Sequence, residues 1–166
     1  MEYALEERIG APYLFTGRKK ELDYFLHWLD EVKKMNSQST AILARRKMGK
    51  TALLERLFNI TFHENGKVIP FYYEVKEGKK WSADFCVDFF LAFAYQYVAF
   101  KTRNTSYLRP LEKNNFQAIL EITQKEGLED LTGLTKSVEY SYTRENIDIL
   151  WNTVREAPKT MAYRHK

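Results

Sequence analysis

The chain has 166 residues, of which 45% are hydrophobic and 29% are charged, a balance that fits one globular domain and excludes a disordered chain. A net charge of +4, from 26 basic and 22 acidic residues, is compatible with phosphate-bearing partners without requiring them. The single cysteine, Cys86, excludes a disulfide-stabilised fold and is expected to be a small core residue in a reducing compartment.

No segment has the pattern of a secretory signal or a membrane span. Met1 opens an acidic, mixed segment that lacks a basic region followed by an apolar one. The most apolar stretch, residues 85–100, contains Asp88 and Gln96 and is shorter than the roughly 20 residues that a span needs. We therefore expect a cytoplasmic protein without membrane contact, in which this stretch is a buried helix.

The first part of the chain alternates between helical and strand-like patterns. Residues 1–15 form an irregular lead-in, and from Arg18 apolar residues recur on one helical face: Leu22, Phe25, Leu26, Leu29 and Val32. The apolar run 41–43 predicts a buried strand, and a second amphipathic helix follows residue 51. Residues 68–75 are β-branched and aromatic, which predicts a second strand.

The second part of the chain is mainly helical in pattern. Ser82 can cap a long helix that reaches about residue 100, and residues 112–126 form another, with Gly127 as its stop. Residues 128–142 are ambiguous, since Val138, Tyr140 and Tyr142 alternate as in a short exposed strand. A last helix starts at residue 143 and is expected to end before Pro158.

This order of elements predicts an α/β fold of the P-loop NTPase type, with a mainly parallel sheet flanked by helices. The prediction is incomplete, because only two core strands are evident and a parallel sheet covered on both faces normally has more.

Residues 44–51, with the sequence ARRKMGKT, match the phosphate-loop (Walker A) pattern GxxxxGK[ST] except at its first position, where alanine replaces glycine. In such a loop the backbone N–H groups and the start of the next helix bind phosphate. Gly49 would let phosphate approach the backbone, Lys50 would reach the β- and γ-phosphates, and Thr51 would hold Mg²⁺. The predicted site comprises Ala44, Arg45, Arg46, Lys47, Met48, Gly49, Lys50, Thr51 and Ala52.

Two features of this loop leave alternatives open. Ala44 resists positive φ, which leaves open the alternative of a plain surface turn before a basic helix start. The basic residues Arg45, Arg46 and Lys47 are compatible with solvation, with attraction of phosphate or with contact to nucleic acid, and solvation is the favoured interpretation.

The residues before the loop carry a family resemblance. Residues 15–22, FTGRKKEL, resemble the F-x-G-R-x-x-E-L box of AAA+ and related STAND-type ATPases, and the loop is similar to the GRRxxGKTxLL form of archaeal and bacterial members. The resemblance covers residues 13–75 and implies ATP and Mg²⁺ as cofactors. It also implies that Phe15, Thr16 and Gly17 lie near the adenine. The alternative is an ordinary helix cap followed by an amphipathic helix.

Hydrolysis also requires an acidic Walker B element at the end of an apolar strand, and no such run is evident. We therefore expect the chain to be the N-terminal part of a P-loop ATPase domain, cut before that strand, and we assign no catalytic residue. In this scheme residues 1–38 are a lead-in and adenine-side helix, 39–75 hold the strands and the loop, and 76–166 are mainly helical. An incomplete sheet would expose an edge that favours self-association.

The function expected from these patterns is an ATP-binding segment of a STAND/AAA+-like ATPase. One alternative is a nucleic-acid or protein-binding module that keeps a degenerate loop. Another is a small phosphotransferase, whose lid and acceptor site cannot be assigned. His27, His63 and His165 are too scattered to predict a metal cage.

Overall fold

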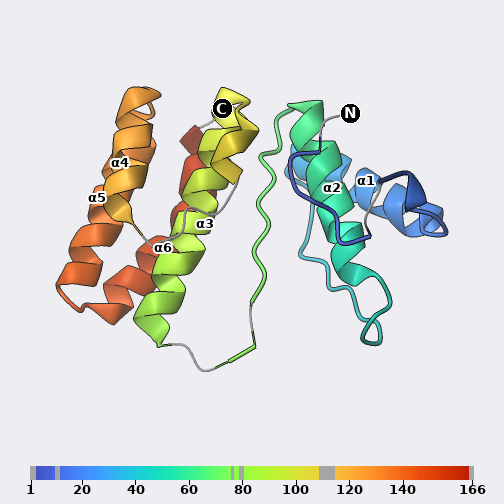
Figure 1. Cartoon of the computed structure of the whole chain (residues 1–166), viewed down its shortest axis with the longest axis horizontal. Helices are drawn as coiled ribbons and strands as arrows, with labels where there is room; N and C mark the ends of the chain where they lie inside the picture. Colours follow the sequence, from blue (N-terminus) through green and yellow to red (C-terminus); the bar gives the residue numbers. More distant parts are fainter. Residues whose placement is uncertain (1–2, 10–11, 76, 79–80, 109–114, 165–166) are drawn as a thin grey trace. The chain divides into compact units, whose positions relative to one another are not determined.

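The computed structural model describes residues 3–9, 12–75, 77–78, 81–108 and 115–164. Within these ranges every regular element is a helix and no strand occurs. The chain divides into two compact units, Met1–Tyr72 and Tyr73–Lys166, called unit 1 and unit 2 here and described separately (Figure 1).

The prediction of an α/β fold with a parallel sheet flanked by helices is wrong for the described part of the chain. Residues 41–43 and 68–75 have no regular secondary structure and belong to no ladder. A strand requires a neighbour that pairs its N–H and C=O groups, and β-rich composition reports a fit to a half-buried surface rather than a backbone state. Leu43 is 92% exposed, so the first of these runs does not enter a core.

Unit 1 contains a short 3₁₀ helix, η1 (Pro12–Leu14), and two helices, α1 (Lys19–Lys33) and α2 (Lys50–Glu64), which contact each other. Both predicted helices are confirmed. Helix α1 buries Phe25, and α2 buries Leu53, Phe58 and Phe62. Helix α2 starts directly after the left-handed Gly49 and ends at Asn65, which is also left-handed, a common way to terminate a helix.

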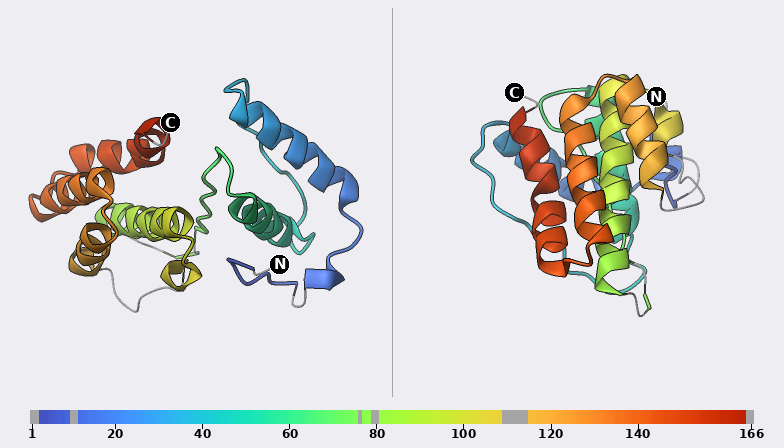
Figure 2. Two further views of the ribbon diagram at one scale, coloured as in Figure 1. Left: turned by 90° about the horizontal axis from the view of Figure 1, so that it is seen from above. Right: turned by 90° about the vertical axis from the view of Figure 1, so that its left-hand side faces the viewer.

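The predicted irregular lead-in runs beside α2 (Figure 2). Side chains of that helix fix it in place. The Asn59 amide accepts a hydrogen bond from the N–H of Leu5 at 2.7 Å and donates one to the carbonyl of Leu5 at 3.0 Å. The Glu55 carboxylate accepts from the backbone N–H of Arg8 at 2.9 Å. Asn59 and Glu55 are both buried, so these bonds satisfy polar groups that water does not reach.

An ion pair completes this attachment. Glu7 Oε2 lies 2.7 Å from Arg56 Nη2, with side-chain exposures of 0% and 13%. The Arg56 guanidinium also lies over the rings of Tyr3 and Phe15, 5.4 and 4.7 Å from their centroids. Tyr3, Leu5, Glu7, Arg8 and Phe15 therefore form one polar and aromatic cluster with α2.

Unit 2 is built from α3 (Ser82–Thr102), η2 (Thr105–Leu108), α4 (Phe116–Lys125), α5 (Glu129–Thr143) and α6 (Ile147–Arg164). Helix α3 contacts the other three long helices, and α5 packs between α4 and α6 (Figure 2). The largest fully buried side chains of this unit are Phe90, Val98, Ile119, Leu131, Val138, Leu150, Val154 and Met161.

For unit 2 the structure resolves one ambiguity and overturns one expectation. The ambiguous residues 129–143 are helical, and the helix places Val138 in the core and Tyr140 on the surface. Helix α6 continues through Pro158 to Arg164. A proline in a helix interior costs a hydrogen bond, but the buried Ala157 and Met161 on either side of it keep the helix against the core.

Helix α3 is the one described helix that is long and apolar enough to cross a membrane, and 61% of its apolar window is buried in the structure. The expectation that this stretch is a buried helix is confirmed, and Cys86 lies on its buried side.

Candidate phosphate-binding site

The predicted phosphate loop is an exposed turn of unit 1 that leads directly into α2. Lys47 and Gly49 have left-handed backbones, with φ of 64° and 73°. Left-handed residues in a turn direct successive N–H groups into one concavity, which is the geometry of an anion-binding nest. Nothing lies within 4 Å of a Cβ built on Gly49, so glycine is required there by conformation and not by space.

The structure removes the objection raised by Ala44. This residue does not have a positive φ, so alanine is accommodated without backbone strain. The left-handed positions of the loop lie nearer its end, at Lys47 and Gly49.

The Lys50 ammonium group closes the loop from the helix side. Its Nζ donates to the carbonyl oxygens of Ala44 at 2.6 Å and Arg45 at 3.0 Å. The positive side chain thus lies across the loop, next to the first turn of α2, where the helix dipole is also positive. Thr51 and Ala52 follow in the same turn and are half-buried.

Arg18 closes the loop from the side of α1. One nitrogen of its guanidinium donates to the carbonyl of Met48, and the other donates to Glu21 Oε1 at 2.6 Å. The pKa of the Glu21 carboxyl is lowered, first by a backbone hydrogen bond and next by the bond from Arg18. Arg18 was not among the predicted site residues, although it is the arginine of the box at residues 15–22.

A cavity of about 500 Å³ lies between the loop, the start of α1 and residues 40–44. Of the predicted site residues, Ala44, Met48, Gly49 and Lys50 line this cavity. The other cationic groups at its wall are Arg18 and Lys20, and its apolar wall includes Tyr24, Phe25, Ile42 and Leu53.

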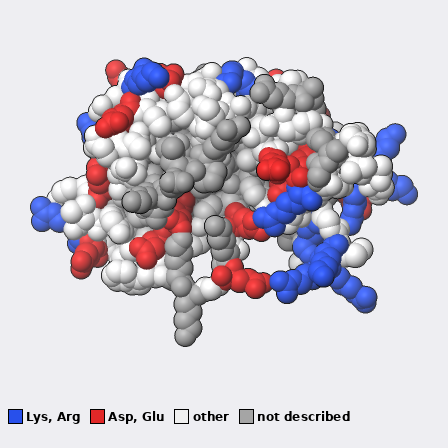
Figure 3. Space-filling view, viewed as in Figure 1, with Lys and Arg blue, Asp and Glu red and all other residues white. Residues whose placement is uncertain are grey.

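The remaining predicted residues lie outside this cavity. Arg45, Arg46 and Lys47 are exposed on the loop, and Figure 3 shows basic side chains gathered where Figure 1 draws this loop, at the lower right. Phe15 lies against Arg56, and Thr16 and Gly17 are exposed beside it. None of the three predicted adenine-side residues lines the cavity.

The described residues contain no group of three or more histidine, cysteine or carboxylate side chains that could hold a metal ion.

The chain was compared with protein-family models, with curated proteins and with solved structures, and it matches none of them.

Proposed function

We propose that residues 44–51 bind the phosphates of a nucleotide, with Mg-ATP as the ligand. The observation that carries the proposal is the position of the Lys50 ammonium group, which lies across the loop at the start of α2 and contacts the Ala44 and Arg45 carbonyls. A cation, a helix N-terminus and a turn with left-handed residues meet at one place, and each of them favours an anion.

Each residue has a defined part in this proposal. The N–H groups at Gly49 and the first turn of α2 donate to phosphate oxygens. Lys50 exchanges two neutral carbonyl acceptors for charged phosphate oxygens, which accept stronger hydrogen bonds. Thr51 holds Mg²⁺, which neutralises phosphate charge when bound. The resemblance of residues 13–75 to STAND/AAA+ ATPases supports ATP over other phosphates, and the proposal concerns binding alone.

The test is a calorimetric titration with Mg-ATP of the unmodified chain and of Lys50→Ala. We expect binding by the first and a loss of about 10- to 100-fold in the second, since a hydrogen bond to a charged group contributes roughly 1.5–3 kcal/mol. Lys67→Ala removes an exposed lysine elsewhere in unit 1 and controls for net charge. No binding by the unmodified chain, or equal affinity in both lysine variants, would refute the proposal.

The exposed basic residues of the loop favour one second candidate, which is binding of single-stranded nucleic acid through its phosphates. Arg45, Arg46 and Lys47 are consecutive and exposed. Binding of this kind weakens steeply with salt. An oligonucleotide titration at several salt concentrations tests it, and the Arg45→Ala/Lys47→Ala double variant should then lower the salt dependence.

A further inference from the structure

The cavity beside the loop has two chemically different parts. Arg18 and Lys50 lie where the wall is formed by the loop, and both are tied to loop carbonyls. The wall contributed by α1, α2 and residues 40–44 carries the apolar side chains Phe25, Ile42 and Leu53, with Lys20 and Glu21 at the start of α1. Such a cavity suits a ligand with an anionic end and a flat apolar body, and its volume of about 500 Å³ lies in the usual range of small-molecule sites.

Tyr24 supplies an aromatic surface at this apolar wall. Its ring is held edge-to-face against Phe25, with centroids 5.1 Å apart, and 57% of the residue remains exposed. A ring that is fixed on one side and open on the other can stack a base without first losing much side-chain freedom.

The alternative base position, at residues 15–17, is less suitable. One face of the Phe15 ring is occupied by the Arg56 guanidinium at 4.7 Å, and Arg56 is itself paired with the buried Glu7. Phe15 is therefore part of the attachment of the N-terminal segment to α2, and it does not line the cavity.

We propose that the base of the bound nucleotide stacks on Tyr24 in the apolar part of this cavity, and not on Phe15. This inference rests on the proposed phosphate binding, because the loop places the phosphates at the other end of the same cavity. It assigns the ligand class as a nucleoside triphosphate whose base adds to the affinity, in contrast to a bare polyphosphate.

The experiment compares Mg-ATP with magnesium tripolyphosphate, which has the phosphates but no base. The unmodified chain should bind Mg-ATP more tightly. Tyr24→Leu should weaken the affinity for Mg-ATP by about tenfold, because the substitution removes the aromatic ring on which the base stacks. The affinity for tripolyphosphate should be unchanged, because the phosphate loop is intact. Tyr24→Phe keeps the ring and should retain the affinity. Tyr13→Leu is the matched control, since Tyr13 is 83% exposed and lies outside the cavity.

The outcomes separate the two proposals. If neither ligand binds to the unmodified chain, the proposed function fails and this inference fails with it. If both ligands bind with equal affinity, or if Tyr24→Leu binds Mg-ATP as tightly as Tyr13→Leu does, phosphate binding stands and the stacking on Tyr24 is refuted. A selective loss of Mg-ATP affinity in Phe15→Leu, with Tyr24→Leu unaffected, would show that the base binds at residues 15–17 and refute stacking on Tyr24.

Discussion

Replacing Glu7 by glutamine tests whether the N-terminal segment is an integral part of unit 1. The Glu7 side chain is completely buried and its Oε2 lies 2.7 Å from Arg56 Nη2, whose side chain is 13% exposed. Glutamine has nearly the same shape, and its oxygen can still accept the 3.0 Å hydrogen bond that the Asn59 amide donates to Glu7 Oε1. The substitution therefore removes the negative charge and places an amide NH₂ donor where Oε2 faced the Arg56 guanidinium.

The expected cost follows from what is left behind. Removing one partner of a buried ion pair costs about 3–5 kcal/mol, because the other charge stays buried without compensation. Arg56 retains its contacts with the rings of Tyr3 and Phe15, which soften this loss. We therefore expect Glu7→Gln to lower the free energy of unfolding of unit 1 by about 3 kcal/mol, at the lower end of that range.

Urea unfolding measured by circular dichroism gives the overall change, and hydrogen exchange in α2 peptides locates it in unit 1. Glu6→Gln is the matched control, since this neighbouring carboxylate is exposed. Surface substitutions usually change the free energy of unfolding by no more than about 0.5 kcal/mol. If the free energies of unfolding of Glu7→Gln and Glu6→Gln differ by less than this, the Glu7–Arg56 pair does not hold the N-terminal segment and the reasoning is wrong.

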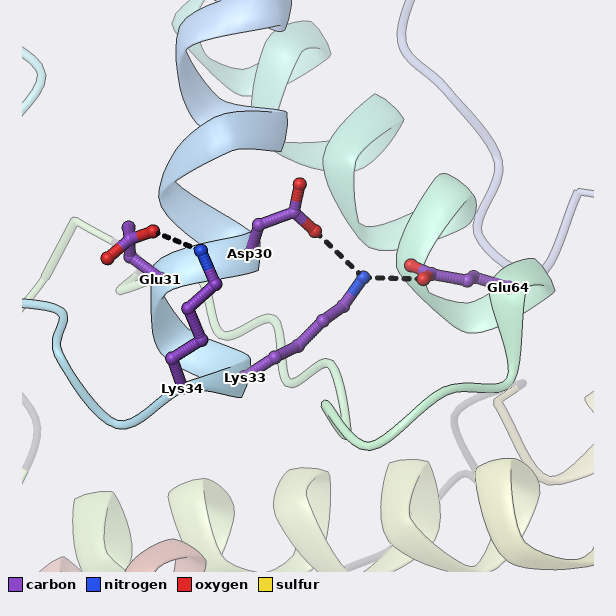
Figure 4. A network of polar contacts seen from close by, with 5 residues as sticks. All are labelled: Asp30, Glu31, Lys33, Lys34 and Glu64. Atoms are coloured by element: carbon purple, nitrogen blue, oxygen red, sulfur yellow. Dashed lines mark hydrogen bonds and ion pairs between the residues drawn. The ribbon is translucent and has the colours of Figure 1, made fainter.

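Three further predictions concern other parts of the chain. Phe90→Ala in α3, at 0% exposure, should cost about 3–5 kcal/mol in thermal unfolding, and a loss below about 1 kcal/mol would contradict the core assigned to unit 2. Lys33 bridges α1 to Glu64 of α2 at 2.5 Å (Figure 4). Lys33→Met should nevertheless lower the free energy of unfolding by less than about 1 kcal/mol. High salt should remove the difference in stability between the variant and the unmodified chain. Arg18→Met should raise the pKa of Glu21 in an NMR titration without fully restoring it, because the backbone hydrogen bond is the larger cause of its lowering. The hydrogen bond from Arg18 to the Glu21 carboxylate stabilises the fold above the ordinary pKa of the carboxyl, and this stabilisation is lost as pH falls through the lowered pKa. Arg18→Met should therefore lose less stability on acidification than the unmodified chain does. An equal loss in both would contradict this prediction.

Helices could be predicted from the sequence where burial follows the helical period. The pattern from Leu22 to Val32 becomes α1, and the apolar stretch after Ser82 becomes the buried α3. Strands could not be predicted in the same way, because a strand is completed by a distant segment that pairs with it. The run at residues 41–43 has the composition of a core strand, yet Leu43 is almost fully exposed.

The site shows the same division between local and distant information. Gly49 and Lys50 are singled out by a pattern that spans only eight residues, and both line the cavity of unit 1. The bond from Arg18 to the Met48 carbonyl spans 30 positions in the sequence, and the bond from Asn59 to Glu7 spans 52. No periodicity links such residues, so a position described as an irregular lead-in proved to hold a buried carboxylate.

The loop itself must be held in shape by side chains that bond to its carbonyl groups. Lys47 adopts a left-handed backbone, which costs a residue with a Cβ roughly 1–2 kcal/mol, and the loop from Ala44 to Gly49 is exposed and buries nothing that would offset this. Arg18 and Lys50 provide the restraint, one through the Met48 carbonyl and the other through the Ala44 and Arg45 carbonyls. These two restraints differ in what a phosphate would do to them. A phosphate that binds Lys50 competes with the carbonyls that this lysine now contacts. The Arg18 guanidinium is also paired with the Glu21 carboxylate at 2.6 Å, so a phosphate would draw it away less readily. Ligand binding should therefore release the Lys50 restraint and leave Arg18 as the contact that keeps the nest in shape.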